Sequence, residues 1–128
     1  MKIKNLIIRG LLVAVPAFLV VQLTGVRSSA KETSNGEQII RISASTFEFM
    51  PSEIVVKKGV PVTLELISQD RHHGFKLPEF HLRADIQAGV VEKVRFIPDK
   101  TGTFTFICDV FCGDGHEDMS GTLKVVER

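Results

Sequence analysis

The stretch GTFTFICDVFCGDGHEDMSGTLKVVE, residues 102–127, contains two runs of alternating apolar and polar residues on either side of a loop. In the first run both phenylalanines share a face with Cys108, because successive side chains of a strand point to opposite faces. In the second run Met119 has the same parity as Leu123. If these faces are the core faces, two strands deliver Cys108 and Met119 to the loop from the inside.

Four earlier runs have the same period-two alternation, and prolines and glycines separate them as turn signals. The runs are QIIRISA (38–44), EIVVKKG (53–59), PVTLELIS (61–68) and VVEKVRFI (90–97). No segment after residue 30 has a helical period. Six short strands in fewer than a hundred residues predict an all-β fold, either an antiparallel β-sandwich or a small barrel with Greek-key connections. Residues 69–88 fit no run and are predicted to form a long loop.

The first 30 residues differ from the rest of this 128-residue chain. Three basic residues precede an uncharged apolar run over residues 10–26, and small residues follow up to Ala30. This order predicts a secretory signal peptide or a single membrane anchor over residues 1–30. In both cases the basic start favours export of everything after Ala30, to the periplasm or the outer face of the membrane. Residues 31–37 are predicted to be a polar linker, and residues 38–128 a single domain.

The net charge of the exported part limits the classes of partner that it can bind. The leader holds four of the 16 basic residues and no acidic residue, which leaves 12 basic and 15 acidic residues and a net charge of −3. Nucleic-acid binding needs a basic surface, so a nucleic-acid partner is excluded.

The loop CDVFCGDGHEDM, residues 108–119, brings together two thiols, an imidazole and a thioether. An even number of cysteines in an exported protein usually forms a disulfide, but a disulfide explains neither His116 nor Met119. Thiolate, thioether and imidazole donors together suit copper, whereas zinc would use only the cysteines and the histidine. A nucleophilic cysteine enzyme would need a cleft and an orienting group that the sequence does not indicate. The spacing alone does not decide between a disulfide, a copper site, a zinc site and a catalytic cysteine.

The pattern Cys108-x3-Cys112-x3-His116-x2-Met119, with the earlier His73-Gly74-Phe75 after Asp70, resembles the CuA domain of the cupredoxin superfamily. That domain occurs in subunit II of cytochrome c oxidases and in nitrous oxide reductases. The resemblance covers about residues 38–127 and implies a cupredoxin-like Greek-key β-sandwich.

The resemblance also implies a binuclear CuA centre of two copper ions. Two thiolates would bridge the ions, one imidazole would bind each ion, and the methionine thioether and a valine carbonyl would be weak ligands. The implied metal ligands are His73, Cys108, Val110, Cys112, His116 and Met119. His72 and His81 are then expected at the surface or beside a ligand without binding the metal. Asp85 lies where a carboxylate could hold a ligand histidine.

Several features depart from the oxidase pattern. Val110 stands where many oxidases have an acidic residue, and Gln87-Ala88-Gly89-Val90 replaces the usual Pro-Gly-Arg segment. The chain has no Trp or Tyr, and its one leader replaces the two membrane helices of many subunits. The leading hypothesis is therefore an exported electron-transfer protein with no catalytic site of its own. Its donor would be a redox protein such as a c-type cytochrome, and its acceptor a second redox protein.

Two alternatives remain. In the first, the chain is subunit II of a haem-copper terminal oxidase, a cytochrome c oxidase, and its partner is the haem-copper subunit I. In the second, it is a mononuclear blue copper protein or a copper carrier.

Overall fold

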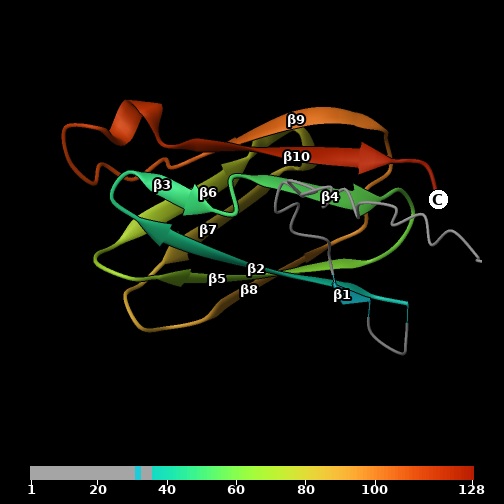
Figure 1. Cartoon of the computed structure of the whole chain (residues 1–128), viewed down its shortest axis with the longest axis horizontal. Helices are drawn as coiled ribbons and strands as arrows, with labels where there is room; N and C mark the ends of the chain where they lie inside the picture. Colours follow the sequence, from blue (N-terminus) through green and yellow to red (C-terminus); the bar gives the residue numbers. More distant parts are fainter. Residues whose placement is uncertain (1–30, 33–35) are drawn as a thin grey trace, which may run out of the picture.

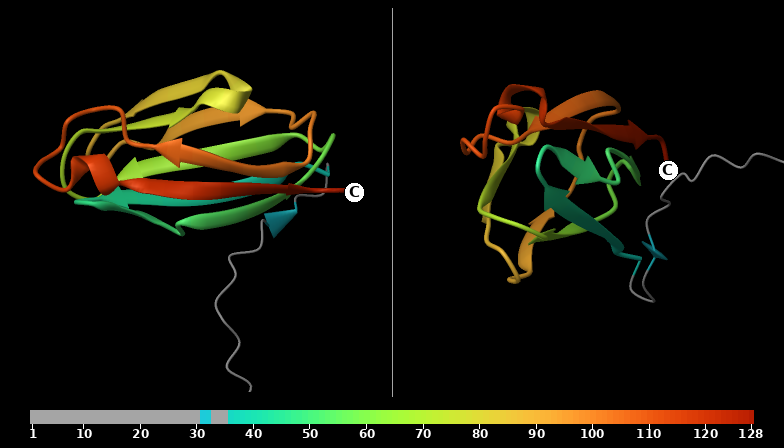
Figure 2. Two further views of the ribbon diagram at one scale, coloured as in Figure 1. Left: turned by 90° about the horizontal axis from the view of Figure 1, so that it is seen from above. Right: turned by 60° about the vertical axis from the view of Figure 1, so that its left-hand side comes forward.

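The computed structural model describes residues 31–32 and 36–128 of the chain. The predicted leader, residues 1–30, lies outside the described residues, as do residues 33–35 of the predicted linker. Two β-sheets face each other, as Figure 1 and the turned views of Figure 2 show. No helix among the described residues is both long and apolar enough to cross a membrane.

The first sheet has the strand order β1-β2-β5-β8, with β3 paired to the side of β2. Its strands are β1 (Lys31–Glu32), β2 (Gln38–Ser45), β3 (Glu48–Met50), β5 (Val62–Ser68) and β8 (Glu92–Phe96). The second sheet has the order β4-β10-β9-β6-β7. Its strands are β4 (Glu53–Lys57), β6 (His73–Leu77), β7 (Leu82–Ile86), β9 (Gly102–Ile107) and β10 (Ser120–Val126).

The all-β sandwich is confirmed, but the expectation of antiparallel pairing throughout is wrong. β2 pairs with β5 in parallel, and β10 pairs with β4 in parallel. The chain crosses from one sheet to the other between β2 and β5, so these neighbours are joined by a crossover and not by a hairpin. Apolar and polar residues alternate with period two in both parallel and antiparallel strand pairs. The alternation in the sequence therefore cannot distinguish the two pairings.

The prediction of a long loop over residues 69–88 is also wrong from residue 73 onward. This segment contains β6 and β7, which pair in antiparallel fashion and are joined by a short 3-10 helix, Pro78–Phe80. β6 lacks alternation because three consecutive residues, His73, Gly74 and Phe75, are all buried. The glycine is covered by a neighbouring loop, and this contact is invisible in the local pattern.

The predicted parities are confirmed at both ends of the stretch that opened the sequence analysis. Phe106, Cys108, Met119 and Leu123 are all at most 4% exposed. They join inward-facing residues of the other sheet, such as Leu64, in one core cluster.

Besides the connection between β7 and β8, three connections lie at one end of the sandwich, on the left in Figure 1. They are the turn between β2 and β3, the loop between β5 and β6 over residues 69–72, and the loop between β9 and β10 over residues 108–119. The last of these contains a second 3-10 helix, His116–Asp118. The candidate metal ligands lie at this end.

Candidate metal centre

His73 is the first residue of β6, and its side chain is fully buried. Its Nε2 atom lies 2.7 Å from Oδ1 of Asp70. Its Nδ1 atom is buried and has no hydrogen-bond partner among the described residues. A buried polar atom without a partner is costly, so this nitrogen is the position at which a metal ion would satisfy the ring.

The carboxylate that orients His73 is Asp70. It accepts hydrogen bonds from the backbone N–H of Thr46 at 2.7 Å, from the Thr46 hydroxyl, and from the backbone N–H of Arg71 at 2.7 Å. Desolvation acts to raise the pKa of Asp70, but the bonds from Thr46 and His73 overcome it and hold the pKa well below its usual range. An ionised Asp70 therefore fixes the ring of His73 with Nε2 as the proton donor.

The expectation that Asp85 holds a ligand histidine is wrong. Asp85 contacts Nε2 of His72 at 3.0 Å, and His72 has a side chain that is 42% exposed. Hydrogen bonds from Arg83 and then from His72 lower the pKa of Asp85. His81 is also exposed, at the end of the first 3-10 helix. The predicted surface positions of His72 and His81 are thus confirmed.

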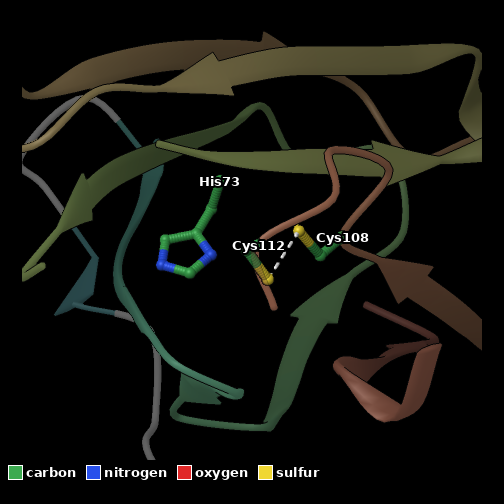
Figure 3. A group of neighbouring side chains, drawn as sticks. All are labelled: His73, Cys108 and Cys112. Atoms are coloured by element: carbon green, nitrogen blue, oxygen red, sulfur yellow. Dashed lines mark hydrogen bonds between the residues drawn. The ribbon is translucent and has the colours of Figure 1, made fainter. Parts of the chain in front are cut away.

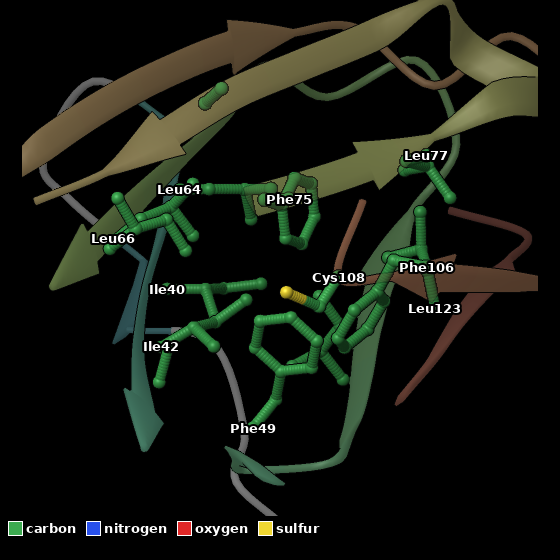
Figure 4. Close-up of a cluster of buried hydrophobic side chains, with 14 of the residues drawn as sticks. Ile40, Ile42, Phe49, Leu64, Leu66, Phe75, Leu77, Phe106, Cys108 and Leu123 are labelled. Carbon is green, nitrogen blue, oxygen red and sulfur yellow. The ribbon is translucent and has the colours of Figure 1, made fainter. Parts of the chain in front are cut away.

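Cys108 and Cys112 are free thiols, 4% and 3% exposed. Their Sγ atoms lie 4.0 Å apart, about twice the length of a disulfide bond. Figure 3 shows the imidazole of His73 facing this pair of sulfur atoms. Figure 4 shows Cys108 among the apolar side chains of the core, and the backbone N–H of Gly74 points to its sulfur at 3.4 Å.

The remaining implied ligands lie around the same two sulfur atoms. Nδ1 of His116 and Sδ of Met119 are each 3.8 Å from Sγ of Cys112. The carbonyl oxygen of Val110 is 3.2 Å from Sγ of Cys108. Met119 is 1% exposed, whereas His116 is half-buried and faces the ring of the exposed Phe111.

Glycines let the loop pass tightly around the site. Gly113 has a φ of +138°, a conformation that residues with a side chain rarely adopt. Gly115 has an ordinary φ of −99°. It is instead a close-approach position, because a Cβ there would lie 2.4 Å from Cδ2 of Phe47.

Burial raises the pKa of the Cys112 thiol to about 11, and the neighbouring Cys108 adds to the shift. The metal-free site therefore carries a protonated Cys112 at neutral pH. A metal ion would have to displace that proton, as thiolate ligands require.

His73, Cys108 and Cys112 form a site whose donor atoms all lie within 4.8 Å of one another. The residues fit a copper ion, since two sulfur donors and an unpartnered imidazole nitrogen converge in a closed, apolar surrounding. Sequence reasoning missed Asp70 as the residue that orients His73, although its position three residues before the histidine was visible. It also missed Thr46, for which the sequence holds no local signal.

A two-sheet β-sandwich with a cysteine and histidine metal site at one end defines a cupredoxin-like copper protein. The chain belongs to the family of cupredoxin-like domains, whose model matches residues 15–125.

Curated relatives narrow this class. Cytochrome c oxidase subunit 2 of Thermus thermophilus is 29% identical over 96 residues, which cover 75% of this chain and 71% of that protein. Nitrous-oxide reductase of Cupriavidus necator is 32% identical over 98 residues, which cover 73% of this chain and only 15% of the reductase. The chain is therefore related to both of these groups.

Solved structures have the same fold. The periplasmic domain of subunit II of cytochrome oxidase (CoxB) of Bradyrhizobium japonicum matches with a TM-score of 0.65 and 23% identity, over 70% of this chain and 83% of that chain. The metal-binding domain of the Cu(I) exporting P-type ATPase CopA of Streptococcus pneumoniae, solved with Cu(I), matches with a TM-score of 0.63 and 25% identity. That match covers 77% of this chain and 94% of that domain.

Proposed function

We propose that the chain is an exported electron-transfer protein that holds a binuclear CuA centre and has no substrate chemistry of its own. The observation that carries the proposal is the buried, unpartnered Nδ1 of His73 beside two free thiols. Bound copper would supply a one-electron redox couple, and the two thiolates of Cys108 and Cys112 would bridge its two ions.

The other ligands follow from their places around the sulfur pair. His73 reaches the site from the start of β6 and His116 from the loop between β9 and β10, and each would bind one ion. Met119 lies on the Cys112 side, and the carbonyl of Val110 lies on the Cys108 side. These would be the two weak ligands.

The protein around the ligands keeps their positions constant during electron transfer. Cys108, Cys112 and Met119 are buried in the core cluster, which excludes water from the sulfur atoms. Asp70 holds the ring of His73 through Nε2. A rigid and dry ligand set changes little when one electron arrives or leaves, which favours fast transfer.

The proposal includes an exported location, with residues 1–30 as signal or anchor, 31–37 as linker and 38–128 as the copper domain. A redox protein such as a c-type cytochrome would be the donor, and a second redox protein the acceptor. Val110 lacks the acidic side chain that many oxidases carry at this position, which favours a protein that works apart from a catalytic subunit.

Copper titration of the reduced, metal-free chain tests the proposal. We expect two copper ions per chain and an electron paramagnetic resonance spectrum of one unpaired electron shared by both ions. His73→Gln should abolish that spectrum, whereas His72→Gln, at the adjacent exposed position, should leave it unchanged. A single copper per wild-type chain would refute the binuclear centre.

Subunit II of a haem-copper terminal oxidase is a second candidate, because the matched relatives include cytochrome c oxidase subunit 2 over 71% of its length. Extraction of the native protein with mild detergent should then recover a haem-containing catalytic subunit in stoichiometric amount. Recovery of a solitary chain would count against this candidate.

A mononuclear copper protein or copper carrier is the third candidate, and the surroundings of Cys112 are the observation behind it. Its sulfur alone contacts His116 and Met119, both at 3.8 Å. Cys108→Ser separates the candidates: a mononuclear site keeps one coloured copper ion, whereas a bridged pair loses its spectrum.

A further inference from the structure

The segment between the two cysteines has little backbone support of its own. Within residues 31–32 and 36–128, no backbone–backbone hydrogen bond involves residues 109–112. Cys108 precedes this segment and bonds through its N–H to the carbonyl of Met119 at 3.0 Å. The segment that must place both sulfur atoms is therefore held by side chains.

Arg83 holds the first part of the segment from strand β7. Its Nε donates to Oδ2 of Asp109 at 3.0 Å, and its Nη1 donates to Oδ2 of Asp85 at 2.5 Å. Asp85 is itself fastened to His72 at 3.0 Å. The guanidinium thus ties the residue that follows Cys108 to the outer face of the β6–β7 hairpin.

The absence of a side chain at Gly74 lets Asp109 pack closely against strand β6. The Oδ1 atom of Asp109 lies 1.9 Å from the position that a Cβ on Gly74 would take, and the backbone nitrogen of Asp109 lies 3.1 Å from it. The loop therefore packs directly on the backbone of β6, one residue from His73. A shift of Asp109 would carry Cys108 and Val110 away from the imidazole.

Arg71 holds the other part of the segment from the loop between β5 and β6. Its Nη1 donates to the carbonyl oxygen of Cys112 at 3.0 Å. Its own backbone N–H is bonded to Asp70, the residue that orients His73. One cation therefore joins the second cysteine to the segment that carries the histidine.

We propose that Arg71 and Arg83 are positioning residues that hold residues 108–112 in their ligand geometry before copper binds. Each arginine spans two segments that are far apart in sequence, and arginine presents several donors in a fixed planar fork. Ordering the loop in advance removes part of the conformational entropy that copper binding would otherwise cost. The inference rests on the proposed function for its purpose, but the ordering itself belongs to the metal-free chain.

The reaction of the metal-free, reduced chain with a thiol reagent such as DTNB tests the ordering. Both thiols are almost completely buried, so they react only when the loop opens. We expect Arg71→Gln and Arg83→Gln each to raise the reaction rate by about twofold to fivefold, the range for partly exposed ion pairs and hydrogen bonds. Arg95→Gln is the matched control, since Arg95 lies on β8 of the other sheet and forms its ion pair with Glu37. Rates equal to this control in both variants would overturn the proposal.

Arg83→Lys separates geometry from charge. A lysine keeps the positive charge but cannot reach both carboxylates in the fixed geometry of the fork. The rate for Arg83→Lys should therefore resemble that of Arg83→Gln, and a rate equal to wild type would refute the role of the fork. High salt should raise the wild-type rate and leave the Arg71→Gln/Arg83→Gln chain almost unchanged.

Copper-loaded chains supply a readout that general stability does not affect. We expect both arginine variants to lose copper to a chelator faster than Arg95→Gln does, with shifted visible absorption bands at unchanged urea midpoints. Unshifted bands with control-like copper loss would contradict the positioning role. If the wild type binds no copper, the proposed function fails, and the thiol rates still decide the loop ordering.

Discussion

Asp70→Ala removes the carboxylate that orients His73, and its cost can be worked out from the contacts. The imidazole is fully buried and its Nδ1 already has no partner, so the change leaves both ring nitrogens unsatisfied. An unsatisfied buried donor costs about 1–3 kcal/mol. The lost bonds from Thr46 and Arg71 lie at exposed positions and add about 1 kcal/mol together. We expect the free energy of unfolding to fall by about 2–4 kcal/mol, out of the roughly 5–15 kcal/mol of a typical domain.

Urea unfolding of the reduced, metal-free chain at pH 7 measures this loss. Asp70→Asn is the isosteric control and should lose less, since the amide oxygen still accepts from His73. Because the folded pKa of Asp70 lies below its usual 3.8, its stabilisation is present above that pH and is lost as the pH falls further. The difference between wild type and Asp70→Ala should therefore shrink below about pH 4.

The copper site gives a second readout of the same change. Loss of a residue that orients a ligand histidine typically lowers metal affinity by about tenfold to a hundredfold. A fall of less than about 1 kcal/mol in stability, together with unchanged copper affinity, would refute the reasoning for Asp70.

Three further predictions concern other parts of the chain. Gly74→Ala places a Cβ within 1.9 Å of a carboxylate oxygen, so urea unfolding should show a loss of about 1–3 kcal/mol and the buried thiols should react faster. The pKa of Glu65 is lowered first by its hydrogen bond from Arg41, so its stabilisation is present above the ordinary value of 4.5 and is lost as the pH falls. Acid unfolding of Glu65→Gln should accordingly be less steep than that of wild type, and equal slopes would contradict this. Copper binding should release protons into weakly buffered solution at pH 7, because the pKa of Cys112 is raised to about 11, and Cys112→Ser should release fewer.

Much of the fold was predictable because it depends on local alternation. All six predicted runs contain strands, and the parities of Cys108 and Met119 placed both side chains correctly on the core side. The β6–β7 hairpin was missed because Gly74 is buried under Asp109, a contact between residues far apart in the chain. The parallel pairs were missed because alternation does not record strand direction.

The candidate site, like the fold, was only partly predictable from the sequence. The spacing of the cysteines, His116 and Met119 within one loop showed that these donors lie close in space, but it left a disulfide and a metal site both open. The resemblance to CuA domains favoured the metal site. The choice of His73 over His72 came from a resemblance. In the structure His73 is fully buried beside the two thiols, whereas His72 is exposed.

By itself, the sequence determined the alternating strands, the core-facing parity of Cys108 and Met119, and the soft character of the donor set. Only the tertiary structure decided that the thiols are free and 4.0 Å apart, that Asp70 and not Asp85 orients the ligand histidine, and that Arg71 and Arg83 contact the cysteine loop. The physical reason is distance along the chain. The bond from Arg71 to Cys112 joins residues 41 positions apart, and only the packing of the two sheets brings such residues together.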